Sequence, residues 1–190
     1  MPRPDTQGEE RPDINAIELL KQDHRTVEGL FESFEKTDEK NEQHRIAQQI
    51  CKELKVHAHI EEEIFYPTAK AQAEQATDQV NEGYVEHLGI KMLVELISGM
   101  DARDEFLESC VTVLKEYVKH HVKEEETEMF PKIEQSGLVM NAIGAQLMEA
   151  KQAYTATLDG RSGRKARGGA RGRGARRSSA GARGGRARRA

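Results

Sequence analysis

The sequence predicts an all-α protein: an antiparallel up-and-down four-helix bundle with a short additional C-terminal helix and disordered tails. Three observations support this fold class. Apolar residues recur at spacings of three and four along most of the chain, which is the pattern of helices that bury one face. The sequence lacks segments with the alternating apolar and polar pattern of strands. Its 190 residues provide one sizeable core plus tails.

Four long helices and a shorter one are predicted in order. The first starts at Asp13, and the others cover roughly 40–66, 79–99, 103–130 and 139–155. Each long helix carries a His on or beside its apolar line. In the first helix, the line comprises Ile17, Leu20, His24, Val27, Phe31 and Phe34.

The third helix shows two adjoining apolar stripes. One stripe holds Val80, Tyr84, His87, Lys91 and Val94, and the other holds Val85, Leu88, Met92 and Leu96. Two prolines follow the second and fourth helical patterns. Because proline lacks the amide donor and clashes with the preceding turn, we expect Pro67 and Pro131 to end or kink their helices.

Charge divides the chain into an acidic body and a basic tail. Residues 161–190 hold 11 Arg and one Lys with no acid, a charge of +12, which leaves 17 basic and 33 acidic residues, or −16, for residues 1–160. The tail has no apolar residue larger than alanine, so it cannot pack a core. We therefore predict a disordered N-terminus over residues 1–12, a bundle over 13–158 and a disordered Arg/Gly/Ala-rich tail over 159–190.

Other features concern the cellular setting. No apolar run approaches the ~20 residues of a membrane span, and the first residues lack the apolar core of a signal peptide. We therefore expect a cytoplasmic protein without membrane association. Cys51 and Cys110 occupy unmatched positions in a chain without an export signal, so both are expected as buried thiols.

An internal repeat is the most informative motif. Residues 55–67 and 119–131, aligned on their final prolines 64 positions apart, match at Lys, His, Glu-Glu, an aromatic residue and Pro. An acidic residue followed by His precedes each copy, at 23–24 and at 86–87. The chain thus reads His, HxxxE, His, HxxxE. Such a doubled unit is what a two-fold site for two metal ions requires.

The spacing of these residues explains why a metal is expected. His57 and Glu61, like His121 and Glu125, are four residues apart and point the same way on a helix. Burying ionised carboxylates in an apolar bundle costs several kcal/mol unless they are paired or coordinated, and a bound cation removes that penalty. Imidazole with carboxylate suits iron, manganese or zinc better than magnesium or calcium.

The alternative reading is a solvated helix face, which a single HxxxE indicates more often than a metal site. Two copies, each preceded by a His within an apolar stripe, favour the metal. The remaining His residues are predicted at the surface: His44, His59 and His120. The other acids near the motifs are predicted as a solvated face: Glu62, Glu63, Glu124, Glu126 and Glu128, of which Glu62 or Glu124 could turn inward.

These motifs resemble the hemerythrin-like HHE cation-binding domain family over roughly residues 13–135. The resemblance implies a four-helix bundle that holds a non-haem di-iron centre, two iron ions with an oxo or hydroxo bridge, manganese or zinc being less expected. It implies terminal ligands and bridging carboxylates by motif match. The terminal ligands are His24, His57, His87 and His121, and the bridging carboxylates are Glu61 and Glu125.

Two departures from the oxygen-carrying members argue against reversible oxygen carriage. Those proteins have a second His where this chain has Lys91, and an Asp five residues after the last His where this chain has Glu125 at four. About one position per iron is then open for dioxygen, peroxide or nitric oxide. Glu28, one turn after His24, and Tyr117, one turn before His121, could reach the ions and are expected near them, as is Lys91.

The leading prediction for function is a non-haem di-iron protein that binds or reacts with a small oxidant, in the setting of oxidative stress. The alternative is an iron-binding protein for iron homeostasis or sensing without turnover. A third reading is a polyanion binder whose metal is structural. Residues 161–190 could bind nucleic acid without sequence preference, or act as a solubilising tail that rests on the acidic body.

Overall fold

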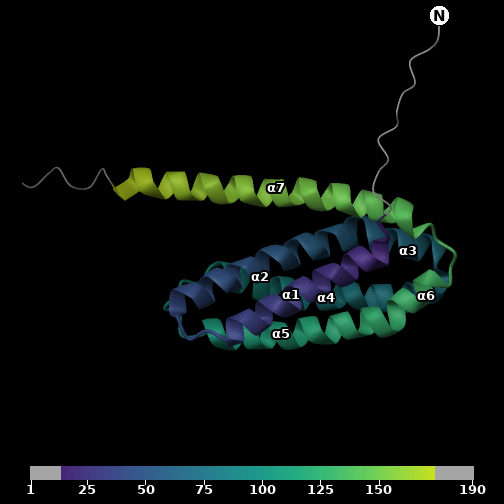
Figure 1. Cartoon of the computed structure of the whole chain (residues 1–190), viewed down its shortest axis with the longest axis horizontal. Coiled ribbons are helices and arrows are strands. Elements are labelled where there is room, and N and C mark those ends of the chain that lie inside the picture. Colours follow the sequence, from purple (N-terminus) through teal and green to yellow (C-terminus); the bar gives the residue numbers. More distant parts are fainter. Residues whose placement is uncertain (1–13, 174–190) are drawn as a thin grey trace, which may run out of the picture. The chain divides into compact units, whose positions relative to one another are not determined.

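The computed structural model describes residues 14–173, with side chains described up to residue 160. All regular structure within this range is helical (Figure 1), which confirms the predicted all-α class. The helices are α1 (Ala16–Glu35), α2 (Lys40–Ile60), η1 (Glu61–Phe65), α3 (Tyr66–Gln72), η2 (Glu74–Ala76), α4 (Thr77–Ser98), α5 (Leu107–Glu124), η3 (Glu125–Met129), α6 (Phe130–Glu134) and α7 (Met140–Arg173). The segments η1 and η3 are single π-helical turns, and η2 is a 3₁₀ turn.

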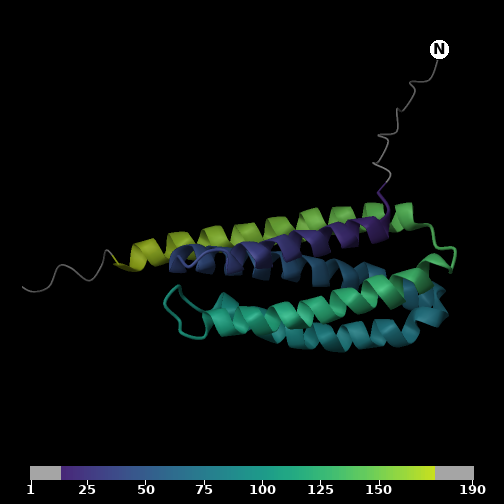
Figure 2. The same ribbon diagram turned by 60° about the horizontal axis from the view of Figure 1, so that its bottom comes forward.

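The bundle is formed by α1, α2, α4 and α5, which run in alternating directions (Figure 1). Helix α1 packs against α2, α2 against α4, and α4 against α5. An ion pair of 2.6 Å between Lys115 of α5 and Glu35 of α1 closes the ring. Figure 2 shows α4 and α5 side by side along their length.

Side chains fix the start of the first two helices. The Asn15 side chain accepts hydrogen bonds from the backbone N–H groups of Ile17 and Glu18, at 2.9 and 3.2 Å. Glu39 does the same for α2, since its carboxylate accepts from the N–H groups of Asn41 and Glu42. Such caps satisfy donors that have no partner inside the helix.

Of the two predicted outcomes, that the prolines end or kink their helices, the structure excludes the first. Pro67 and Pro131 are the second residues of α3 and α6, and the helical path continues beyond them. A π-turn precedes each proline: the N–H of Tyr66, for example, bonds to the carbonyl of Glu61, five residues back. At the start of a new helical register the missing proline N–H is not needed. The helix therefore passes through the metal motif without ending.

The core consists of two apolar clusters with a polar layer between them. One cluster includes Leu20, Phe65 and Leu147, and the other includes Phe31 and Leu114. The buried polar residues between the clusters are His24, His57, Glu61, His87, His121 and Glu125. This layer positions the candidate site in the middle of the bundle.

The C-terminal helix is longer than predicted. It was expected over 139–155, but α7 continues to Arg173 and takes in part of the segment predicted to be disordered. Ala, Arg and Lys favour a helix, but the five glycines between 160 and 172 do not, so propensity alone does not explain the extension. The rest of the predicted tails, residues 1–13 and 174–190, lies outside the described residues.

By its contacts the chain forms two units, one up to Tyr154 and one from Thr155, so only the first part of α7 belongs to the bundle unit. In that part Leu147 is fully buried. Helix α7 approaches the start of the bundle so closely that a Cβ on Gly144 would lie 1.8 Å from the carbonyl oxygen of Ile14. Only glycine allows this contact.

The two cysteines differ in their surroundings. Cys51 is a buried thiol as predicted, and burial raises its pKa to about 11. Cys110 is only half-buried and packs against the apolar cluster that contains Phe31 and Leu114, so its prediction as a buried thiol is met only in part. As to the membrane, no helix within residues 14–173 combines the length and apolar character needed to cross one.

Candidate metal centre

The structure brings the six residues predicted as ligands into one buried cluster. Their exposures lie between 0 and 5%. His24 comes from α1, His57 from α2, His87 from α4 and His121 from α5, while Glu61 and Glu125 open the two π-turns. A π-turn inserts an extra residue into a helix and is frequent at functional sites. Here it occurs where each carboxylate enters the polar layer.

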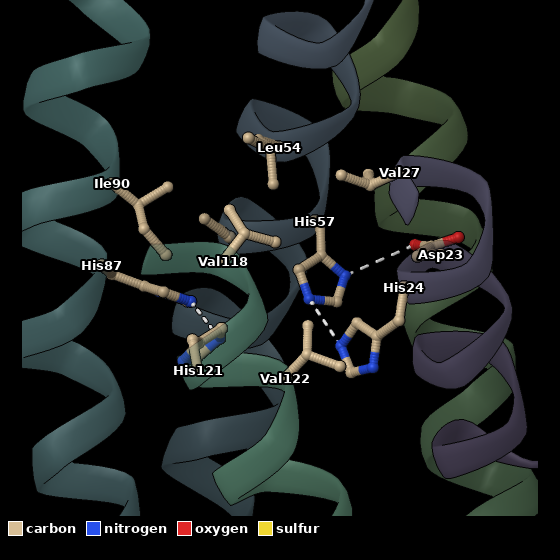
Figure 3. Close-up of a pocket in the computed structure, with 11 residues that line it drawn as sticks. Asp23, His24, Val27, Leu54, His57, His87, Ile90, Val118, His121 and Val122 are labelled. Atoms are coloured by element: carbon tan, nitrogen blue, oxygen red, sulfur yellow. Dashed lines mark hydrogen bonds and ion pairs between the residues drawn. The ribbon is translucent and has the colours of Figure 1, made fainter. Parts of the chain in front are cut away.

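The four imidazoles form two facing pairs (Figure 3). The Nε2 atoms of His24 and His57 are 3.2 Å apart, and those of His87 and His121 are 3.1 Å apart. Two nitrogen ligands at right angles and about 2.1 Å from one ion would be about 3.0 Å apart. Each pair can therefore hold one ion.

Each carboxylate contacts one imidazole of each pair. The Oε2 atom of Glu125 lies 3.2 Å from Nε2 of His24 and 3.5 Å from Nε2 of His121. In the same way Oε2 of Glu61 lies 3.2 Å from Nε2 of His57 and 3.4 Å from Nε2 of His87. Both carboxylates thus lie between the two imidazole pairs.

The buried carboxylates of this cluster favour the binding of a cation, which would neutralise their charge. Within the described part of the chain, three buried carboxylate oxygens have no hydrogen-bond partner. They are both oxygens of Glu61 and the Oε2 atom of Glu125. Burial and the nearby charge of Glu125 raise the pKa of Glu61 well above its usual value. Burial also acts on Glu125, but the imidazoles of His121 and His24 outweigh it and hold the pKa of Glu125 below its usual range.

The imidazoles are suited to binding a metal ion. Burial lowers the pKa of His57 to about 4, so its ring is neutral near pH 7 and its nitrogen lone pair is available. Four imidazoles with two carboxylates are a donor set that suits iron, manganese or zinc. The residues present therefore fit such a metal, which would neutralise the two buried carboxylates.

Outside the imidazoles lies a ring of four further carboxylates, which face the Nδ1 atoms. The pairs are His24 with Glu126 at 2.8 Å, His87 with Glu62 at 2.9 Å, His121 with Glu86 at 2.7 Å and His57 with Asp23 at 3.7 Å. In every pair the carboxylate comes from the neighbouring helix of the bundle. A carboxylate at Nδ1 fixes the ring orientation and directs Nε2 toward the centre.

Basic side chains pair with these outer carboxylates in turn. Arg25 pairs with Glu126 at 2.5 Å, Lys91 with Glu62 at 2.6 Å, Lys151 with Asp23, and His120 with Glu86 at 3.3 Å. Hydrogen bonds from His87 and Lys91 hold the pKa of Glu62 at about 2. Lys91 thus supports His87 indirectly, through Glu62.

The outer ring was not predicted from the sequence. Glu126 was expected on a solvated face, and Glu62 on that face or turned inward. Each bonds to an imidazole, because the next helix of the bundle lies against it. A signal was present, since an acid directly follows each motif carboxylate and an acid directly precedes His24 and His87. The sequence could not show which imidazole each acid meets.

Two residues expected near the ions lie elsewhere. Glu28 is half exposed and pairs with Arg25 at 2.9 Å, which draws its carboxylate to the surface. Tyr117 is exposed and lies against Gly89 of α4, where a Cβ would be 3.1 Å from its ring. Neither side chain lies at the central cluster, where both had been considered able to reach the ions.

Tyr66 is a fully buried residue at the centre that was not predicted from the sequence. Its hydroxyl donates a 2.8 Å hydrogen bond to Oε1 of Glu125, and its ring stacks on His87 with centroids 5.5 Å apart. Gly83 provides the space, since a Cβ there would lie 2.8 Å from the Tyr66 hydroxyl. The signal was the aromatic position of the repeat, which is Tyr in one copy and Phe130 in the other.

A small cavity of about 10 Å³ adjoins the imidazoles (Figure 3). Its apolar walls include Val27, Leu54, Ile90, Val118 and Val122. The volume is close to the minimum that a single water molecule requires. The cavity can thus admit only a molecule of very few atoms.

A helical bundle with a buried layer of four imidazoles and two carboxylates defines a cation-binding helical protein. The chain belongs to the hemerythrin HHE cation binding domain family, which matches residues 15–133. A crystal structure of a hemerythrin HHE cation binding domain-containing protein from Mycobacterium kansasii has the same fold. The TM-score is 0.65 at 21% identity, over 76% of this chain and 89% of that one.

A second relative is a DNA nickase from Nostoc sp. (strain PCC 7120 / SAG 25.82 / UTEX 2576). It is 30% identical over 128 residues, which make up 67% of this chain and 36% of the nickase. The chain therefore spans little more than a third of the length of that relative.

Proposed function

We propose that the centre holds two iron ions and that the protein binds or reacts with a small oxidant: dioxygen, peroxide or nitric oxide. His24 and His57 would hold one ion, and His87 and His121 the other. Glu61 and Glu125 would bridge the two. The observation that carries this proposal is that the Oε2 atom of each carboxylate contacts imidazoles of both pairs.

Iron would supply electrons and an open position for a diatomic or triatomic ligand. The protein's own groups have defined tasks. The outer carboxylates orient the imidazoles, and the apolar cavity beside them excludes bulk water while admitting a small molecule. The Tyr66 hydroxyl donates its proton in a hydrogen bond to Oε1 of Glu125, within the polar layer, where a reacting oxygen species could use that proton.

The test is anaerobic reconstitution with ferrous iron, followed by metal analysis and visible spectra before and after adding air, peroxide or nitric oxide. We expect two ions per chain and a new absorption band with at least one of these oxidants. Zinc-loaded protein serves as the control, since zinc has no redox chemistry. A wild-type protein that binds one ion per chain would contradict the proposal.

Iron homeostasis or sensing without turnover is the alternative within the same site. Both proposals use the same residues, and they differ in the rate at which the protein would consume peroxide. Catalysis requires peroxide to be consumed well above the rate of free iron at equal concentration. A spectrum that changes without such consumption would favour the binding role.

Association with nucleic acid is a second, separate proposal. The +12 charge of residues 161–190 supports it, and so does the likeness to a relative named as a DNA nickase. We expect DNA or RNA binding without sequence preference that weakens steeply as salt rises, because counterions are released. Truncation after Gly160 should abolish it, and unchanged retention would contradict the proposal. A supercoiled plasmid in the same assay reports whether nicking accompanies binding.

A further inference from the structure

Helix α4 is apolar on two sides, although the bundle covers only one. Its inner stripe, which includes Val80, Ile90 and Val94, is buried in the core. Its outer stripe is exposed: Val85 by 67%, Leu88 by 65%, Met92 by 71% and Leu96 by 52%. A helix that is apolar all round is normally buried on all sides.

Helix α5 and the residue before it extend this surface. The exposed side chains are Phe106 by 60%, Val113 by 44% and Tyr117 by 49%. The Tyr117 ring lies against Gly89, which joins the α5 residues to the α4 stripe. The two helices lie side by side (Figure 2). We call the seven exposed side chains the α4–α5 face: Val85, Leu88, Met92, Leu96, Phe106, Val113 and Tyr117.

The internal repeat provides a control for the meaning of this face. The first half has the same helices in the same roles, offset by 63 residues for α1 and α4 and by 64 for α2 and α5. The residues equivalent to the α4–α5 face are Gln22, Arg25, Gly29, Ser33, Glu42, Gln49 and Glu53. None of these has a large apolar side chain. The bundle therefore folds without an apolar surface at these positions, and the α4–α5 face serves something else.

The terminal segments of the chain are poor candidates for covering this face. Residues 161–190 contain no apolar residue larger than alanine, and residues 1–13 contain only Met1 and three prolines of apolar character. A second copy of the chain is a better match. The seven side chains expose roughly 700 Å², so two such faces would bury about 1,400 Å² in total, which lies within the range of stable protein interfaces.

We propose that two copies of this chain associate through their α4–α5 faces to form a two-fold symmetric dimer. Such an interface uses the same surface on both copies. A two-fold axis near Met92 would cross the middle of the stripe and run the two α4 helices antiparallel. Glu82, which lines the groove between α4 and α5 ten residues before Met92, would then lie away from its own copy. Docking would also shield Glu86, which orients His121, from water.

The experiment is light scattering and sedimentation of the full-length, metal-loaded protein over a hundredfold range of concentration. High salt is included, because it screens charge attraction between the basic tail and the acidic body but does not weaken apolar contact. We expect wild type at twice the 21.4 kDa chain mass. Met92→Glu places a charge at the centre of the face and should raise the dimer dissociation constant at least ~100-fold.

The matched control is Gly29→Glu, the same change at the equivalent position of α1. A Cβ at Gly29 would meet nothing within 4 Å, so this variant should fold and remain dimeric. If Met92→Glu loses its helical circular dichroism, Leu88→Arg replaces it, since Arg occupies the equivalent position 25. A wild type at single-chain mass at all concentrations would overturn the proposal. So would a folded α4 variant that dimerises as tightly as wild type.

Discussion

The two halves of the metal centre share a skeleton but differ at one hydroxyl group. In the second half, Glu125 accepts a hydrogen bond from Tyr66 at 2.8 Å. Glu61 is the equivalent of Glu125, and the equivalent of Tyr66 is Phe130, which stacks on His24 but has no hydroxyl to donate. Among the described residues, Glu61 has no hydrogen-bond partner for either oxygen. The repeat thus makes two similar half-sites, and the Tyr66 hydroxyl is one of the differences between them.

This difference has an electrostatic consequence. Without a cation, burial and Glu125 keep the pKa of Glu61 raised, whereas the imidazoles keep the pKa of Glu125 lowered. Glu61 therefore holds a proton more tightly than Glu125 does. Cation binding competes with that proton. Equivalent carboxylates in the repeat thus differ in proton affinity in the fold.

Removing one of the two carboxylates proposed to bridge the ions should have the largest effect. If Glu61 and Glu125 contact the same two ions, Glu61→Ala and Glu125→Ala should each reduce bound metal from two ions per chain to fewer than one. Their losses should be strongly non-additive, because residues that act as a unit do not contribute independently. Glu63→Ala is the control, since Glu63 is exposed on the same π-turn. Losses of one ion each that simply add would indicate two independent sites.

The outer carboxylates offer the next comparison. Asp23 and Glu86 are equivalent in the repeat, but Glu86 lies 2.7 Å from its imidazole and Asp23 lies 3.7 Å from its own. Glu86→Gln should lower metal affinity about 10–100-fold, as changes to such supporting groups generally do. Asp23→Asn should cost less, because its contact is longer. Competition with a chelator measures both, and the reverse order would contradict the geometry.

In metal-free protein, the equivalent residues His57 and His121 should change the stability of the fold in opposite directions as the pH falls. Burial lowers the pKa of His57 to about 4 from its usual value of 6.5. The folded state then binds fewer protons than the unfolded state. The stability that neutral His57 contributes is therefore present above about pH 6.5 and is lost as the pH falls through about 4. His57→Gln should flatten that decline in melting temperature.

The equivalent His121 behaves in the opposite way. Burial would lower its pKa, but the charge of Glu125 and the bond to Glu86 raise it. Its contribution is therefore fully present below about 6.5 and lost as pH rises through the folded value. His121→Gln should thus cost most stability at low pH. Parallel pH profiles for the two variants would refute the contrast.

The smallest expected effect comes from making the halves alike. Tyr66→Phe removes one hydrogen bond to a carboxylate, a loss of about 1–3 kcal/mol that lowers the melting temperature by several degrees. Two ions should still bind, but the visible spectrum of the iron-loaded protein should shift. Phe130→Tyr is the reciprocal variant. A Tyr66→Phe protein with the spectrum and melting temperature of wild type would show that the hydroxyl is unimportant.

The sequence by itself determined the helical class, the internal repeat and the six residues of the central cluster. Helical periodicity and the spacing of four depend only on local geometry, so His57 with Glu61 and His121 with Glu125 could be paired from their spacing alone. The family match and the fold confirmed the predicted family and helical class. Passage of the helix through Pro67 and Pro131 was not predicted, because a π-turn leaves no simple sequence signal.

Only the tertiary structure decided which acid supports which imidazole. Asp23 precedes His24 in sequence but faces His57, and Glu62 follows Glu61 but bonds to His87. These partners lie on neighbouring helices, so their distance depends on how the helices cross rather than on spacing along the chain. The same reason applies to Tyr66, which fits only beside Gly83. It applies also to the outer stripe of α4, which is exposed because the other helices of the bundle pack against the opposite side of α4.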